Sequence, residues 1–202
     1  MTITAMIGVA LAAFSFAMAK GWTDSEETQS VHLTANQASM RIMPVMQNAK
    51  YVGLVRAGSS STPAAVMFWQ TDANDDNLMQ ATELGLLEFI PSSERVALYE
   101  ADFPAGTPQS QIDSMSDTDV TIEDLNDSAA PEDFKAMLTQ VNPSYTPRPL
   151  AASVTDARFE VKNLDSETQR PSFVYTLTIT KNGSSVVEYG AATLRGATSP
   201  DE

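Results

Sequence analysis

The chain has 202 residues, a formal net charge of −14 and no cysteine. So acidic a chain is not expected to bind nucleic acid or anionic lipid through basic patches, and cations are the small partners that its charge favours. The absence of cysteine excludes disulfides, thiolate zinc sites and cysteine nucleophiles. The single histidine, His32, excludes Ser-His-Asp catalysis and multi-histidine metal sites from the rest of the chain.

The segment of residues 3–19 is apolar throughout and contains no charge and no proline. A helix of roughly 17 residues just reaches across the hydrocarbon core of a bilayer. Lys20 and Trp22 follow directly and fit the headgroup region of a membrane. The segment therefore predicts a minimal single membrane span.

Two other interpretations of this opening stay open. Ala17-Met18-Ala19 matches the small-x-small pattern that ends a cleaved signal peptide, although no basic residue precedes the apolar run. A buried core helix is the third interpretation, and it is the least favoured because soluble folds seldom bury a segment that is apolar on every side at a terminus.

The pattern of residues 24–50 predicts an amphipathic continuation of the same helix. Apolar residues recur at spacings of three and four, which is typical of a helix with one face on a sheet and the other in water. The predicted buried stripe consists of Val31, Ala35, Ala38, Ile42, Val45, Ala49 and Val52. Pro44 lies inside this pattern and lacks an N–H donor, so a kink or a new helix start is expected near Met43.

Residues 53–202 are long enough for one β-rich head domain. Short apolar runs bounded by turn residues predict strands at about 51–55, 64–70, 84–90, 96–100, 152–161, 172–180 and 185–195. The strand at 172–180 alternates with a period of two, and Asn182-Gly183 predicts a tight hairpin turn to the strand that follows it.

Residues 101–149 differ from the rest of the head because they are rich in proline and acidic residues. The best helix start is at Ser128, with Pro131 and two acidic residues in the first turn. We expect an insertion of one or two short helices lying on the sheet. Its acidic character is more typical of a solvated face, and a second calcium site is the alternative.

The segment Asp72–Glu83 has the spacing of a twelve-residue calcium loop. Oxygen ligands stand at the first, third, fifth, seventh, ninth and twelfth places, which is the arrangement that Ca²⁺ prefers. The predicted ligands are Asp72, Asn74, Asp76, Leu78 through its carbonyl, Gln80 and Glu83. Asn77 stands at the sixth place, where glycine is usual, and asparagine tolerates the left-handed conformation needed there.

A simpler interpretation of this segment is a surface turn, since Asp and Asn turn the chain without any ion. The flanking runs look like strands rather than helices. We therefore expect the loop to join two strands of a sheet and a bound calcium ion to brace that hairpin, not to act as a switch.

Taken together, the stalk TITAMIGVALAAFSFAMAKGW and QASMRIMPVMQNAKYVG, the phrase RPLAASVTDARFEV and the final strand VVEYGAATLRG resemble type IV pilin-like proteins. Within that superfamily the chain is most similar to the J- and W-type minor pseudopilins of type II secretion. The resemblance implies an α+β fold in which a long N-terminal helix packs on an antiparallel sheet. It also implies a non-catalytic subunit in the bacterial inner membrane, with its head in the periplasm.

The resemblance further implies that the partners are other pilin-like subunits, bound through the N-terminal helix, and that there is no small-molecule substrate. The chain departs from the family at the processing signal, because a glycine followed by phenylalanine and a Thr-Leu-x-Glu run is absent and residues 3–19 contain no glutamate. Either the true start lies upstream, or this protein is not processed and assembled like the members of that family.

Two functions of other classes are weighed against this one. The first is a secreted calcium-binding adhesion or binding module, released by signal peptidase. The second is an enzyme, which the sequence disfavours because it contains no recognisable general base and no glycine-rich phosphate loop.

Overall fold

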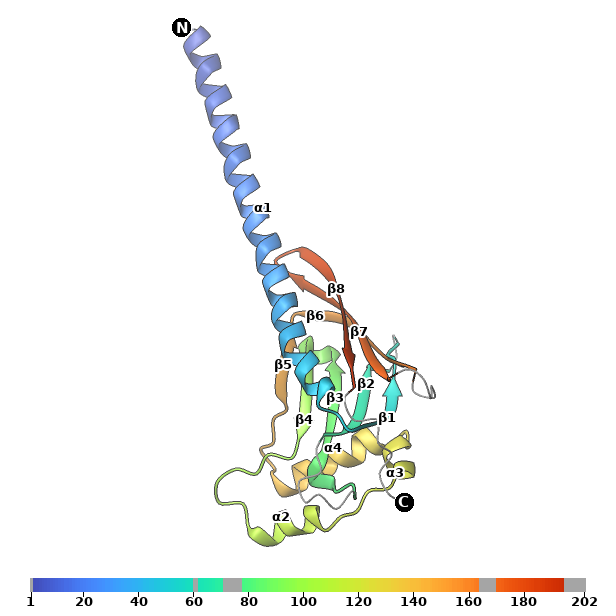
Figure 1. The fold of residues 1–202 in the computed structure, drawn as a ribbon. Coiled ribbons are helices and arrows are strands. Elements are labelled where there is room, and N and C mark those ends of the chain that lie inside the picture. Colours follow the sequence, from blue (N-terminus) through green and yellow to red (C-terminus); the bar gives the residue numbers. More distant parts are fainter. Residues whose placement is uncertain (1, 60–61, 71–77, 164–169, 195–202) are drawn as a thin grey trace.

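One long helix, α1 (Thr2–Gln47), leads into a β-rich head (Figure 1). The computed structural model describes residues 2–59, 62–70, 78–163 and 170–194, with side chains from residue 13 onward. Within these residues the chain is α+β, with a long N-terminal helix and antiparallel sheets, as the sequence predicted.

The second half of α1 buries the predicted stripe. Val31, Ala35, Ala38, Ile42 and Ala49 are each at most 2% exposed, and they pack on strands of the head. Only one position of the stripe differs. Val45 is half-buried, and Met46 is fully buried beside it.

Of the two expectations near Met43, a kink or a new helix start, the new start is wrong, because α1 continues as a single helix through Pro44. Proline removes the hydrogen bond to the carbonyl four residues earlier, which belongs to Met40. Pro44 and Met40 both lie on the exposed face, where water can satisfy that carbonyl. Ile42 before the proline and Met46 after it are both buried, so the helix is packed on the head on both sides of Pro44.

The first sheet has five strands in sequence order, all antiparallel. They are β1 (Tyr51–Arg56), β2 (Ala65–Trp69), β3 (Leu84–Ile90), β4 (Arg95–Glu100) and β5 (Arg148–Ala152). The predicted strands of this half are confirmed. The segment that contains the predicted calcium loop joins β2 to β3, as expected, and ends in the 3₁₀ turn η1 (Ala81–Glu83). A second 3₁₀ turn, η2 (Pro91–Ser93), joins β3 to β4.

The second sheet has three antiparallel strands, β6 (Val154–Lys162), β7 (Ser172–Lys181) and β8 (Ser184–Thr193). The predicted hairpin between β7 and β8 is confirmed. Asn182 and Gly183 both have positive φ, 51° and 85°, as a type I′ turn requires.

The strand predicted at 152–161 is confirmed as β6, whereas β5 just before it was not predicted, and the two strands belong to different sheets. Ser153 separates them with a φ of 59°. This left-handed residue turns the chain away from β4 and toward β7. Serine carries no strong preference for that conformation, so the apolar pattern alone could not reveal the break.

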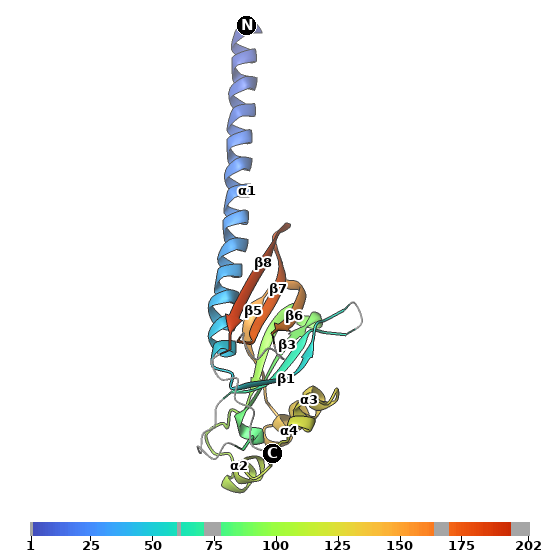
Figure 2. The ribbon, with the colours of Figure 1, turned by 45° about the vertical axis from the view of Figure 1, so that its right-hand side comes forward.

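The insertion forms three helices, α2 (Gln109–Ser116), α3 (Ile122–Asn126) and α4 (Ala130–Val141), where one or two were predicted. Figure 2 shows them at the end of the head away from the start of α1. Thr121 caps α3, and its side chain accepts a hydrogen bond from the backbone of Asp124.

Two apolar cores lie on opposite faces of the five-stranded sheet. Alternate residues of β2 divide between them. Val66 and Phe68 join the core beneath α1, whereas Met67 and Trp69 join the core beneath the insertion. Both faces of β2 are therefore covered, which explains why its five residues are all apolar and all buried.

Candidate functional site

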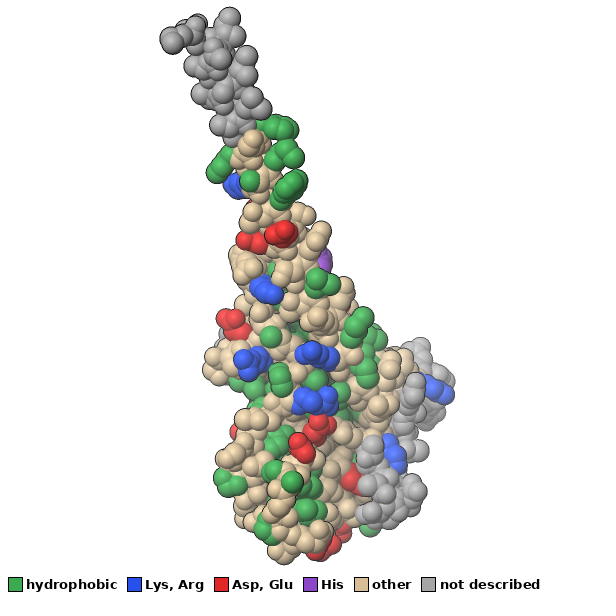
Figure 3. Space-filling view, turned by 90° about the vertical axis from the view of Figure 1, so that its left-hand side faces the viewer, with side chains coloured by type: hydrophobic (Ala, Val, Ile, Leu, Met, Phe, Trp, Pro, Cys, Tyr) green, Lys and Arg blue, Asp and Glu red, His purple; other side chains and the backbone are tan. Residues whose placement is uncertain are grey.

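The first half of α1 projects beyond the head (Figures 1 and 2). The side chains from Ala13 to Glu26 are all exposed, including large apolar ones such as Phe14, Phe16 and Trp22 at 64%, 74% and 69%. Figure 3 shows hydrophobic side chains gathered around this end of the described surface. Exposed apolar side chains grouped in this way are typical of a surface that contacts another molecule or a membrane.

The predicted membrane span at residues 3–19 falls mainly on residues 3–12, which are helical but whose side chains lie outside the described part. Across the portion that is described, no helix combines the length and the apolar character needed to cross a bilayer. The membrane span stays a prediction.

The second half of α1 is fixed to the head along β8, β5 and β7. Small residues on the helix, Ala35 and Ala38, allow its backbone to approach the sheets closely. Large side chains on β7 fill the opposite side of the contact, and Phe173, Tyr175 and Leu177 are fully buried. Close packing of this kind makes α1 and the three-stranded sheet one rigid unit.

A chain of hydrogen bonds crosses this contact. The Tyr175 hydroxyl donates to Ser39 Oγ at 2.7 Å, and Ser39 Oγ donates to Glu188 Oε1 at 2.7 Å. Burial raises the pKa of Tyr175, and the hydrogen bond to Ser39 opposes that rise. The three residues come from α1, β7 and β8, so the chain fixes the rotation of the helix on the sheet.

Glu83, the predicted twelfth ligand of the calcium loop, is buried at the start of β3. Its Oε2 accepts a hydrogen bond from Trp69 Nε1 at 3.0 Å and a longer one from the backbone N–H of Gln80 at 3.4 Å. A buried carboxylate needs such donors. Glu83 therefore links the end of the loop to β2 through Trp69, an interaction that does not depend on an ion.

The other predicted calcium ligands divide into two groups. Asp72, Asn74 and Asp76 lie outside the described residues. Leu78 is 41% exposed, and Gln80 forms an isolated β-bridge with Asp119 in the insertion. Within the described residues, no group of three or more acidic or histidine side chains could hold a metal ion. That finding covers the described part of the insertion, so the alternative of a second calcium site gains no support there.

The insertion is bound to the sheet through a buried charge. Glu88 of β3 is 6% exposed, and both of its carboxylate oxygens lie 3.1 Å from Lys135 Nζ of α4. Lys135 also pairs with Glu132 at 2.8 Å and lies over the ring of Tyr99. Burial, followed by the nearby Glu88 carboxylate, raises the pKa of Tyr99 to about 12.

Backbone pairing also joins the insertion to the end of the predicted calcium loop. The N–H of Val120 donates to the carbonyl of Met79 at 2.8 Å, and the N–H of Ala81 donates to the carbonyl of Thr118 at 3.1 Å. The segment between α2 and α3 therefore runs beside η1. An ion or a mutation in the loop can act on the insertion through these contacts.

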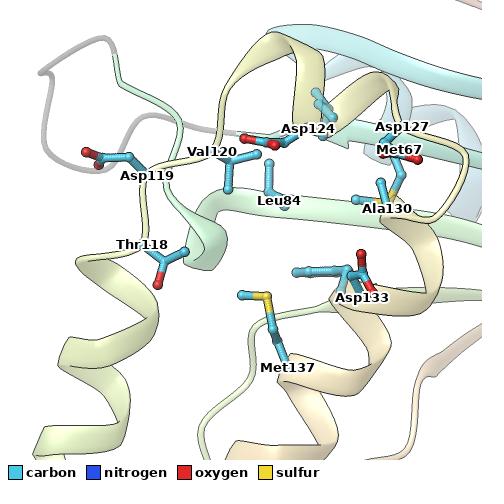
Figure 4. A pocket seen from close by; sticks show the side chains of 12 residues that line it. Met67, Leu84, Thr118, Asp119, Val120, Asp124, Asp127, Ala130, Asp133 and Met137 are labelled. Carbon is cyan, nitrogen blue, oxygen red and sulfur yellow. The ribbon is translucent and has the colours of Figure 1, made fainter.

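A hollow remains where the insertion meets the sheet (Figure 4). It has a volume of about 230 Å³ and an apolar floor that includes Met67, Leu84 and Phe134. Asp124, Asp127 and Asp133 are exposed at its rim. The Thr121 side chain, which donates to Asp124 Oδ2 at 2.7 Å, lowers the pKa of the Asp124 carboxyl.

The sequence analysis did not identify the Ser39–Tyr175–Glu188 chain, the Glu88–Lys135 pair or the hollow. The first carried a usable signal, because a two-residue turn at Asn182-Gly183 fixes the register that pairs Tyr175 with Gly190. The other two depend on how α4 lies on the sheet, and Glu88 and Lys135 are 47 residues apart in the sequence. No local pattern encodes that separation.

No protein-family model, no curated protein and no solved structure matches this chain.

Proposed function

We propose that the chain is a non-catalytic, membrane-anchored pilin-like subunit of a type II secretion or type IV pilus-like assembly. In this proposal the projecting half of α1 is anchored in the bacterial inner membrane and packs against other subunits, and the head lies in the periplasm. The observation that carries the proposal is the contrast along α1, where the second half buries one face in the head and the first half projects with large apolar side chains exposed.

The physical argument concerns the cost of that exposed surface. Phe14, Phe16, Met18 and Trp22 keep between 43% and 74% of their surface in solvent. Burying such side chains is worth roughly 1.5–3 kcal/mol each, so a second molecule or a lipid phase that covers them gains substantial free energy. The rigid contact between α1 and β7 then transmits the position of the stalk to the head.

Calcium is the cofactor in this proposal, and it braces the β2–β3 hairpin. The described ligands Leu78, Gln80 and Glu83 supply oxygen atoms of the kind that Ca²⁺ prefers. Because Gln80 and Ala81 are paired with the insertion, a bound ion would stabilise the insertion as well as the hairpin.

The assembly proposal can be tested by cross-linking, since the natural chain has no cysteine. Single-cysteine variants Met18→Cys and Glu160→Cys should be expressed in a bacterial host that carries a type II secretion system, and its membranes oxidised. We expect Met18→Cys to form dimers and Glu160→Cys, on the outer face of β6, to stay monomeric. Equal cross-linking at both positions would contradict assembly through the stalk.

Intact-mass analysis of membrane and soluble fractions separates the proposal from a secreted module. The subunit should be found in the membrane fraction with residues 3–19 retained. A soluble product that begins at Lys20 would establish cleavage by signal peptidase and a secreted protein instead.

The calcium proposal has its own test. Thermal unfolding should be compared in calcium and in chelator for the wild type and for the double variant Asp72→Asn/Asp76→Asn. With calcium at a hundred times its dissociation constant, the wild type should gain about 2.7 kcal/mol and the variant much less. The matched control Asp113→Asn/Asp117→Asn, in and beside α2, should respond to calcium like the wild type. A wild type that does not respond would exclude the bound ion.

A further inference from the structure

The hollow beneath the insertion combines an apolar interior with a negatively charged opening. Met67 and Leu84 of the sheet form one wall, and Phe134 and Met137 of α4 form another. Figure 4 shows the Met137 side chain extending from α4 toward the space below Leu84. Met137 is only half-buried, so this space opens to solvent beside it.

The segment around this opening is strongly acidic, and the nearby Arg56 guanidinium donates to the carbonyl of Ser128 and not to a rim carboxylate. Residues 101–147 contain nine acidic residues and one basic residue, Lys135, for a net charge of −8. Lys135 is committed to Glu88 and Glu132. Within the described part of the chain, no ion pair involves Asp124, Asp127 or Asp133. A segment whose apolar side chain enters the hollow therefore meets three rim carboxylates that form no ion pair within the described residues.

We propose that this hollow is an anchor site for a protein partner, and that it takes one apolar side chain from a segment that carries lysine or arginine on both sides of it. The apolar side chain packs on the half-buried Val120, Ala130 and Met137, which lie around a floor of buried apolar residues. The flanking cations lie near the rim carboxylates, where the local field attracts them. This inference goes beyond the proposed function and does not depend on the role of the stalk.

The size of the hollow favours a side chain over a free metabolite. Its volume of about 230 Å³ lies below the roughly 300–1,000 Å³ of typical small-molecule sites. The rim carboxylates come from α3, the segment after it, and α4, so they surround the opening instead of converging on one point. A single ammonium group cannot meet them all, whereas a basic segment can.

The charges at the rim do not suit a bare metal ion. Asp124 Oδ2 already accepts hydrogen bonds from both the backbone N–H and the hydroxyl of Thr121, and Asp127 Oδ1 accepts one from the backbone N–H of Ala129 at 2.8 Å. Nor do the described acidic residues form a cluster able to hold a metal. Diffuse attraction of a basic segment needs no such cluster.

The test uses the full chain in a non-ionic detergent, labelled with ¹³C at the methionine methyl groups. The probe is a blocked five-residue peptide with a central leucine and two lysines on each side. Its two comparison peptides replace the leucine with glycine or the lysines with glutamates. The methyl signals of Met67 and Met137, assigned with Met67→Leu and Met137→Leu, report binding at the hollow itself.

We expect the leucine–lysine peptide to shift both methyl signals in a saturable way. Glycine in place of leucine should weaken binding roughly ten-fold or more, because an apolar side chain no longer fills the hollow. The glutamate peptide should not shift the signals. Shifts of the same size with the glycine peptide, or no shift with any peptide, would overturn the proposal.

The variant Asp127→Asn/Asp133→Asn tests the rim, and Glu123→Gln is its matched control. Glu123 is an exposed acidic residue of α3 that does not line the hollow. The double variant should weaken binding of the leucine–lysine peptide roughly three- to ten-fold, whereas the control should bind like the wild type. Equal affinity for all three proteins would overturn the role of the rim. If hexylammonium matched the peptide in affinity, the site would be one for a free amine and not for a protein segment.

Discussion

The two faces of the five-stranded sheet are covered in different ways. On one face α1 and the three-stranded sheet make a closed apolar contact, whose polar members Ser39, Tyr175 and Glu188 are bonded to one another. On the other face the insertion leaves a hollow and is held by the buried charge of Glu88. One face is built for permanent packing, and the other keeps unfilled apolar surface within reach of a partner.

This difference follows from the lengths and patterns of the helices that cover the two faces. The stripe of α1 is a regular run of apolar residues that matches the sheets along its whole length. The insertion consists of three short helices, of which α3 has five residues and α2 has eight. Helices of this length bury too little surface to seal a sheet face completely. Ion pairs and backbone pairing therefore supplement their packing.

The largest expected effect lies on the α1 face. Ile42→Ala removes a fully buried side chain from the closed contact. We expect the free energy of unfolding, measured in urea, to fall by about 3 kcal/mol, because the rigid surroundings cannot fill the space left behind. Leu33→Ala, on the opposite face of the same helix and 62% exposed in the wild type, should change it by less than about 0.5 kcal/mol. Similar losses for both variants would mean that the contact is not closed.

The second prediction concerns the charge beneath the insertion. Lys135→Met leaves the buried Glu88 carboxylate without its ammonium partner and should lower the free energy of unfolding by about 2–3 kcal/mol. The double variant Glu88→Leu/Lys135→Met removes both charges and should recover most of that loss. Glu132→Gln, at the 67% exposed partner, should cost less than about 1 kcal/mol. A double variant no more stable than Lys135→Met would show that the two residues do not interact.

The third prediction returns to the α1 face and the space beneath Tyr175. A Cβ atom at Gly190 would collide with the Tyr175 ring, which itself is enclosed by α1 and the sheet. Gly190→Ala should therefore lower the free energy of unfolding by about 2 kcal/mol. Gly21→Ala is the control, because nothing lies within 4 Å of the added carbon and alanine favours the helix. Equal stability of the Gly190 variant and the wild type would mean that the ring is free to move.

The α1 face was largely predictable from the sequence and the insertion face was not. The stripe from Val31 to Ala49 shows the helical period directly, and Asn182-Gly183 sets the whole β7–β8 register. Lys135 and Glu88 meet only because α4 lies on the sheet, and the left-handed Ser153 that separates the two sheets has no sequence signature. Periodicity describes one element at a time, whereas the hollow and the ion pair depend on pairs of elements.

The predicted calcium loop illustrates the same limit. Its spacing was readable in the sequence, but the partner of Glu83 was not, because Trp69 lies on the neighbouring strand and reaches it through the sheet register. In the sequence, a glutamate that binds calcium at the twelfth place of the loop cannot be distinguished from a glutamate that accepts a hydrogen bond from an indole N–H. Only the fold shows that Glu83 Oε2 accepts from Trp69, while Asp72, Asn74 and Asp76 lie outside its described part.

The smallest expected effect is a difference in pH dependence. The pKa of Tyr99 rises from 10.0 to about 12 in the folded protein, mainly because the ring is buried and next because Glu88 is close. Between these two values the unfolded chain loses the phenolic proton while the folded chain keeps it. The unfolded state then binds fewer protons, so the free energy of unfolding falls as pH rises.

Tyr99→Phe removes this contribution. Its free energy of unfolding in urea should decline less steeply than that of the wild type above about pH 10, and the two proteins should differ by a constant amount below about pH 9. Because Tyr99 is only half-buried, solvent screening makes the change in slope modest. Parallel curves through the alkaline range would show that the insertion face is open enough to hydrate the Tyr99 phenolate. The Glu88–Lys135 ion pair beside it would then also be open to water, unlike the closed contact beneath α1.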